Sequence, residues 1–108
     1  MAGSISRGDV RLYRFGSPDK TRPVLVLTRD TSLKLLSTAT VAPITSSIRG
    51  VPSEVELNED DGMKTICAVN LQNAVTVPQD RLGRRLAQLR PERMRLVCAA
   101  LRFSLGCD

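Results

Sequence analysis

Short apolar segments rich in β-branched residues alternate with turn formers from Val10 to about residue 77. Breaks such as Gly50-Val51-Pro52 and Asp60-Asp61-Gly62 have the composition of turns and loops. Several short strands in succession favour a small antiparallel barrel. The pattern predicts strands at Asp9–Phe15, Pro23–Thr28, Ser37–Thr45, Ser53–Leu57, Thr65–Val69 and Ala74–Val77.

The hydrophobic period changes after Pro91 and becomes helical. Pro91 suits the first helical position and Gly106 suits the C-terminal cap. A shorter helical turn is predicted at Gln79–Leu89, with its leucines on the buried side. The expected fold class is therefore mainly β with a C-terminal helix. One stripe of that helix is formed by Met94, Val97, Cys98, Leu101 and Leu105.

Residues 1–108 are expected to form one domain, because a chain of 108 residues supports a single modest core. An active site must then use a surface or a groove between two copies. Hydrophobic residues make up 42% of the chain, but its aromatic residues are only Tyr13, Phe15 and Phe103. We expect Phe15 and Phe103 in the core, alongside Val, Leu, Ile and Ala.

The net charge of +5 favours a polyanionic partner, although many basic domains bind no nucleic acid. The charges are uneven: five acids lie between Glu54 and Asp61, and seven arginines against one glutamate lie between Arg81 and Arg102. This asymmetry indicates one face for an anion and another face for a different partner.

Cysteine and histidine usage narrows the chemistry. The three cysteines are odd in number and lack C-x-x-C spacing, which argues against disulfides and a zinc site and favours reduced thiols in the cytoplasm. With no histidine, the commonest general base and metal ligand is missing, so we expect neither a metal nor a cofactor. No signal peptide or membrane span is expected, since no run of about 18 apolar residues occurs.

Three segments carry candidate chemistry. Arg22 precedes Pro23 at the mouth of an apolar strand, where its guanidinium suits a phosphate, although by base rate alone a solvated arginine before a strand is favoured. Thr45-Ser46-Ser47 ends another apolar strand, with hydroxyls that bond a phosphate oxygen or simply close a turn. Asn70-Leu71-Gln72-Asn73 offers amides that read base edges or form an ordinary turn.

These motifs, in this order and spacing, resemble the MazF/PemK family of toxins. The resemblance covers Ser6 to Gly106. It implies an SH3-like barrel, a homodimer, cleavage of single-stranded RNA without metal, and inhibition by a MazE-type antitoxin. The motifs that carry it are Arg7-Gly8-Asp9-Val10, Thr21-Arg22-Pro23-Val24-Leu25-Val26, Val41-Ala42-Pro43-Ile44-Thr45-Ser46, and Gln72-Asn73 before Arg81-Leu82.

The resemblance also implies roles for particular residues. Arg22 matches the family's catalytic arginine, and Thr45 matches its catalytic hydroxyl. Gln72 and Asn73 match positions that contact RNA. The full set of RNA-binding residues that we predict is Ser17, Lys20, Thr21, Ser46, Ser47, Asn70, Gln72 and Asn73.

The missing histidine is consistent with a reaction in which the RNA supplies its own nucleophile, the 2′-OH, and leaves 2′,3′-cyclic phosphate and 5′-OH ends. The protein then provides alignment and charge stabilisation. Arg22 is assigned mainly an electrostatic role, because an arginine guanidinium stays protonated in proteins and is a poor general base.

Two functions from other classes also fit a small basic β domain. A CcdB-like gyrase poison shares the expected fold and has no nuclease activity, but it would need a gyrase-binding C-terminal end, typically with Trp, which this chain lacks. A non-catalytic nucleic-acid-binding barrel would normally use exposed aromatic residues for base stacking, and few are present. The sequence therefore favours the endoribonuclease toxin.

Overall fold

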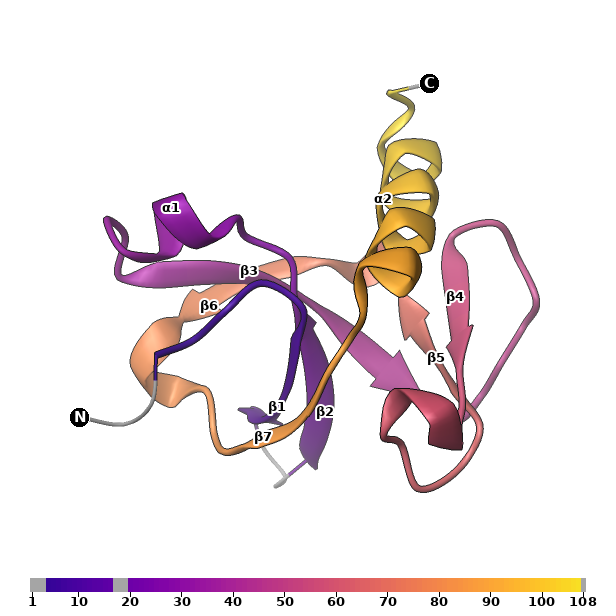
Figure 1. Cartoon of the computed structure of the whole chain (residues 1–108), viewed down its shortest axis with the longest axis horizontal. Helices are drawn as coiled ribbons and strands as arrows, with labels where there is room; N and C mark the ends of the chain where they lie inside the picture. The colour runs from indigo at the N-terminus through magenta and orange to yellow at the C-terminus, as the bar shows by residue number, and fades with distance from the viewer. Residues whose placement is uncertain (1–3, 17–19, 108) are drawn as a thin grey trace.

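The computed structural model describes residues 4–16 and 20–107, so the predicted RNA-binding residue Ser17 lies outside the described residues. The strands form one curled antiparallel sheet in the order β4-β5-β3-β2-β1-β7, with β6 also paired to β3 (Figure 1). The mainly β fold with a C-terminal helix is confirmed. Its elements are β1 (Asp9–Phe15), β2 (Lys20–Val26), α1 (Asp30–Leu33), β3 (Thr38–Thr45), β4 (Glu54–Leu57), η1 (Glu59–Asp61), β5 (Cys67–Asn70), η2 (Leu71–Asn73), β6 (Val75–Pro78), η3 (Gln79–Arg81), β7 (Arg85–Gln88) and α2 (Pro91–Leu105).

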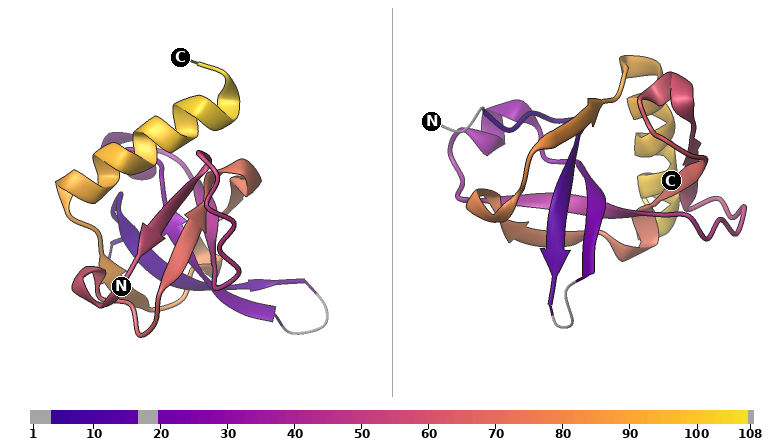
Figure 2. Two further views of the ribbon diagram at one scale, coloured as in Figure 1. Left: turned by 90° about the vertical axis from the view of Figure 1, so that its right-hand side faces the viewer. Right: turned by 90° about the horizontal axis from the view of Figure 1, so that it is seen from below.

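Strand β3 is the centre of the sheet because it pairs with three other strands. Its first half pairs with β6, its middle with β2 and its last two residues, Ile44 and Thr45, with β5. Figures 1 and 2 show β3 running across the molecule, with α2 beside β4 and β5. The end of β3 therefore joins the β4–β5 pair to the rest of the sheet.

The curl divides the buried side chains into two clusters. Ala39 and Val41 of β3 belong to the smaller cluster, while Ala42 and Ile44 belong to the larger one. Alternation along β2 does the same, since Val24 faces the smaller cluster and Leu25 the larger. The interior is mainly aliphatic, as the composition predicts.

Helix α2 confirms the predicted C-terminal helix and covers the larger cluster. Pro91 occupies its first turn, and Gly106 caps its end with a φ of 70°, a left-handed conformation that glycine adopts without strain. Val97 is fully buried, but Leu105 is 66% exposed, so the predicted apolar stripe ends one turn early. Phe103 is 50% exposed, and its placement in the core is wrong.

The predicted helical turn at Gln79–Leu89 is also wrong, beyond the short η3. Its second half is strand β7, which pairs with β1. The N–H of Gly83 donates to the carbonyl of Leu12 at 2.7 Å, and a Cβ on Gly83 would lie 3.1 Å from that oxygen. The segment therefore forms hydrogen bonds with the open edge of β1, and this tertiary pairing overrides the local preference for a helix that the spacing of the leucines indicates.

A buried carboxylate ties β7 to the start of β1. Asp9 is fully buried and accepts hydrogen bonds from the Arg11 guanidinium and the Ser6 N–H, both at 3.0 Å. It also accepts from the Gln88 amide of β7 and lies 3.8 Å from the Arg85 guanidinium. Since a buried charge is stable only when paired, these contacts fix where β7 lies.

No helix within the described ranges has both the length and the apolar character needed to cross a membrane.

Candidate active site

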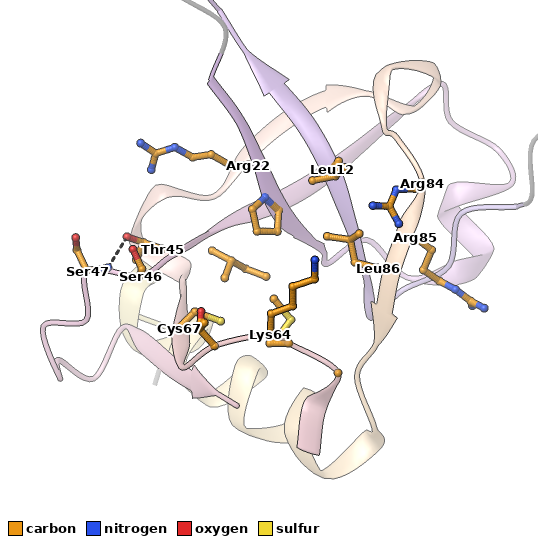
Figure 3. Close-up of a pocket in the computed structure, with 15 residues that line it drawn as sticks. Leu12, Arg22, Thr45, Ser46, Ser47, Lys64, Cys67, Arg84, Arg85 and Leu86 are labelled. Carbon is orange, nitrogen blue, oxygen red and sulfur yellow. Dashed lines mark hydrogen bonds between the residues drawn. The ribbon is translucent and has the colours of Figure 1, made fainter. Parts of the chain in front are cut away.

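A groove of about 730 Å³ opens where β2, the end of β3 and β7 surround the segment after η1 (Figure 3). It brings together four residues of the predicted site, Arg22, Thr45, Ser46 and Ser47. Its apolar floor includes Leu12, Pro23 and Ile44. The remaining lining residues are Gly62, Met63, Lys64, Thr65, Cys67, Arg84, Arg85 and Leu86.

Arg22 lies within β2, opposite Tyr13 of β1, and not before the strand as predicted. Strand β2 begins two residues earlier, at Lys20, and includes Lys20 and Thr21 although neither is apolar. The Arg22 side chain is exposed, and Figure 3 shows its guanidinium pointing away from the middle of the groove. The guanidinium therefore stands at one rim, where an anion can reach its fork of donors.

Thr45 closes a turn, which is one of the two roles that the sequence allowed for this hydroxyl. Its Oγ1 accepts a hydrogen bond from the Ser47 N–H at 3.0 Å (Figure 3). A threonine hydroxyl has one hydrogen to donate and two lone pairs, so this bond leaves the hydrogen free. The turn thus fixes the Thr45 oxygen while keeping it able to donate to a phosphoryl oxygen.

The other rim carries cations that the sequence analysis missed. Figure 3 shows Arg84 and Arg85 on the side of the groove away from Thr45, with the Lys64 side chain between the two sides. The excess of arginine after Arg81 was visible in the sequence. However, a helical turn at Gln79–Leu89 would not have placed Arg84 and Arg85 in the same groove as Arg22. Lys64 had no sequence signal beyond its charge.

The segment that carries Lys64 is held in place at its base. Asn58 and Asp61 form a reciprocal capping box around η1. Asp61, whose side chain is 1% exposed, also pairs with the Arg93 Nε of α2 at 2.8 Å. Gly62 has a φ of +91°, and a Cβ added there would lie 3.0 Å from the Ala87 Cβ of β7. The segment therefore packs against both α2 and β7.

The electrostatics of the groove favour an anion. Its cationic lining residues are Arg22, Lys64, Arg84 and Arg85, and none of the described lining residues is acidic. One of these four cations, Arg85, lies 3.8 Å from the buried Asp9 carboxylate, which offsets part of the positive charge of Arg85. A phosphate chain crossing the groove would meet donors on both rims and no repelling carboxylate.

Cys67 lines the groove but is ill suited to act as a nucleophile. Burial raises the pKa of its thiol above the ordinary 9.0, and the nearby Asp61 carboxylate raises it further. Since the thiolate is the nucleophilic form, the protonated thiol is chemically inert near neutral pH.

Five predicted RNA-binding residues do not line this groove: Lys20, Thr21, Asn70, Gln72 and Asn73. Lys20 and Thr21 lie in the hairpin of β1 and β2, and the three amides lie at η2. The side-chain Oδ1 of Asn70 accepts a hydrogen bond from the Gln72 N–H at 3.1 Å, which is the ordinary turn considered from the sequence. Gln72 and Asn73 are exposed.

In the part of the chain that the structure describes, no group of three or more Cys, Asp or Glu side chains is arranged to hold a metal ion.

Comparison with known proteins identifies the family. The family model of PemK-like, MazF-like toxins of type II toxin-antitoxin systems matches residues 6–105. The chain belongs to this family. The predicted resemblance to MazF toxins and the enzyme class, an endoribonuclease, are thereby confirmed.

Named relatives of this MazF-like chain cover most of its length. The probable endoribonuclease MazF2 of Mycobacterium tuberculosis is 37% identical over 104 residues, 95% of this chain and 100% of that protein. The probable endoribonuclease MazF5 of the same organism is 42% identical over 88 residues, 81% of each chain.

Solved structures of MazF proteins share the fold. The Mycobacterium tuberculosis toxin MazF-mt6 is 30% identical with a TM-score of 0.84, covering 93% of this chain and 98% of that one. A mycobacterial endoribonuclease in complex with its cognate antitoxin has a TM-score of 0.87 at 24% identity, covering 96% of this chain and 97% of that one. The second likeness concerns the fold alone.

Proposed function

We propose that this MazF-like toxin cuts single-stranded RNA at selected sequences in the groove between Thr45 and β7, by a metal-independent reaction that uses the RNA's own 2′-OH. The observation that carries the proposal is the groove itself, whose described lining combines four cations, three consecutive hydroxyl residues and no carboxylate. Such a surface suits a phosphate chain. The protein then needs to supply positioning and charge, but no nucleophile.

In the proposed step, the 2′-oxygen attacks the adjacent phosphorus and the bond from phosphorus to the 5′-oxygen breaks. The 2′-OH loses its proton, and the 5′-oxygen gains one. The products are a 2′,3′-cyclic phosphate and a free 5′-OH. Negative charge grows on the phosphoryl oxygens during attack, so donors fixed near them stabilise the transition state.

Arg22 and Thr45 are the proposed catalytic residues. The Arg22 guanidinium supplies charge and paired donors to the phosphoryl oxygens, while the Thr45 hydroxyl donates the hydrogen that the Ser47 contact leaves free. Ser46 and Ser47 extend the phosphate-binding rim. We also assign RNA contacts to Ser17. Outside the groove, we assign them to Lys20, Thr21, Asn70, Gln72 and Asn73, with the amides suited to base edges.

Two partners belong to the same proposal. A homodimer is expected because edge strands of a small sheet are stabilised when a second copy covers them. A MazE-type antitoxin with an acidic, partly disordered tail would compete with RNA for the cationic groove. Sedimentation of one chain mass at micromolar concentration would refute the dimer, and independent binding of RNA and antitoxin peptide would refute the shared site.

The test is cleavage of a long RNA in EDTA, with the cut sites mapped and then copied into short oligonucleotides. The wild-type protein should cut the all-ribose oligonucleotide and leave the cyclic phosphate. An oligonucleotide with one 2′-hydrogen at the cut nucleotide should bind and stay intact, because most phosphate and base contacts remain. Cutting of the deoxy strand, or a strict requirement for divalent metal, would overturn the mechanism.

A further inference from the structure

Lys64 is the cation that the structure places between the two rims of the groove. Its side chain is exposed, and no hydrogen bond or ion pair to it occurs within residues 4–16 and 20–107. Figure 3 shows the side chain rising from the segment after η1 into the space between the Thr45 side and the Arg84 side. A lysine ammonium is a compact, mobile point charge, so its position depends on the backbone that carries it.

That backbone is fixed on two sides. The Asp61 carboxylate is held by Arg93 of α2, and Gly62 packs against Ala87 of β7 at a distance that leaves no room for a Cβ. An exposed cation on a surface loop usually needs no such support. Here the support holds a positive charge over a groove whose other described cations lie on its rims.

Arg84, directly before β7, continues the same path. Its backbone carbonyl accepts a hydrogen bond from the Leu12 N–H at 3.4 Å, which holds the residue against β1. Its exposed side chain makes no hydrogen bond or ion pair with any described residue, unlike Arg85, which lies 3.8 Å from the Asp9 carboxylate. Arg84 therefore presents a full positive charge to a ligand.

We propose that Lys64 and Arg84 bind backbone phosphates that flank the cleaved bond, so that the RNA crosses the groove from Thr45 over Lys64 to β7. The proposal rests on the proposed function and adds two positioning residues to it. Neither residue is assigned a part in bond breaking. Both act by fixing the register of the strand relative to Arg22.

The size of the effect follows from counterion release. For a single strand, each phosphate contact contributes about 0.7 to the slope of log binding constant against log salt. Loss of one contact should therefore weaken binding about fivefold at about 0.1 M salt and leave it nearly unchanged near 1 M. A change confined to low salt distinguishes a phosphate contact from a loss of folded protein.

The experiment measures binding of the uncleaved deoxy-substituted oligonucleotide over a range of salt concentrations. Lys64→Gln is compared with Lys34→Gln, and Arg84→Gln with Arg90→Gln, since Lys34 and Arg90 are exposed and lie outside the groove. Each variant and its control remove one positive charge from the chain. Lys64→Arg tests rescue, because a guanidinium also binds phosphate.

We expect Lys64→Gln and Arg84→Gln each to lower the salt slope by about 0.7 and the controls to leave it unchanged. Lys64→Arg should restore it. Equal slopes for a variant and its control would overturn the inference while wild-type cleavage still supports the proposed function. Unchanged binding with a lower single-turnover rate would also overturn it, by making Lys64 a catalytic residue. Failure of the wild-type protein to bind or cut RNA would refute the proposed function instead.

Discussion

Replacing Arg93 with methionine removes the ion pair between α2 and the segment that carries Lys64. The Asp61 carboxylate would keep its hydrogen bond from the Asn58 N–H at 3.0 Å but lose the guanidinium 2.8 Å away. Methionine preserves the apolar part of the side chain. The change therefore isolates the cost of leaving a buried carboxylate without its cation.

The structure sets the size of this cost. Loss of one partner from a fully buried pair typically destabilises a protein by about 3–5 kcal/mol. The Asp61 side chain is 1% exposed, but that of Arg93 is 26% exposed, so water can partly replace the guanidinium. We therefore expect about 2–3 kcal/mol, which is a large part of the roughly 5–15 kcal/mol typical of a domain.

Thermal unfolding at one fixed protomer concentration measures the loss, because dimer formation makes the midpoint depend on concentration. About 2–3 kcal/mol corresponds to a fall of roughly 10–20 °C in the midpoint. The double variant Arg93→Met with Asp61→Asn is the matched control. In this double variant, the side-chain amide oxygen of the new asparagine at position 61 still accepts the Asn58 N–H. Because no unpaired charge stays buried, the double variant should be more stable than Arg93→Met alone.

Two results would refute this reasoning. A midpoint for Arg93→Met within about 3 °C of the wild type would mean that the ion pair contributes little, as exposed pairs do. Simple addition of the two single effects in the double variant would mean that the two side chains do not interact.

Further predictions concern the hydroxyl, the tight turn and the thiols. Thr45→Ser should keep most cleavage, whereas Thr45→Val should lower the single-turnover rate by about 10²–10³-fold. Gly62→Ala forces a side chain into a left-handed φ against Ala87, so a lower thermal midpoint and weaker RNA binding at low salt are expected. Iodoacetamide at about pH 8 should label the exposed Cys107 and spare the protonated Cys67, as mass spectrometry would detect. Because the pKa of Cys67 is raised in the folded chain, the free energy of unfolding should fall as the pH rises above 9.0, and Cys67→Ala should reduce that slope in denaturant titrations.

Much of the fold could be predicted because local patterns agree with the tertiary structure. β1 has the predicted bounds, and the predicted strands at Ser37–Thr45 and Ser53–Leu57 differ from β3 and β4 by one residue. The prediction for β2 began too late, at Pro23, because Lys20 and Thr21 are polar. They belong to the strand through their pairing with Phe15 and Arg14, which no hydropathy pattern records.

The missed elements depend on contacts between distant parts of the chain. β7 pairs with β1, which lies about 75 residues earlier in the chain, whereas the leucines in and around β7 (Leu82, Leu86 and Leu89) have the spacing of a helix. Leu82 packs against the smaller cluster and Leu86 against the larger, so they share no helical face. Arg84 lines the groove because of this pairing, and the segment that carries Lys64 packs against Ala87 of the same strand. The assignments to Gln72 and Asn73 stay predictions.

The pairing of β7 with β1 also affects when the protein becomes active during synthesis. β1 is synthesised before β7, so its buried Asp9 receives the Gln88 side chain and the nearby Arg85 charge only after residues 85–88 have been made. The groove gains its second rim at the same stage, because Arg84 and Leu86 belong to the same segment of the chain. A nascent chain that has not yet reached β7 therefore lacks a complete groove.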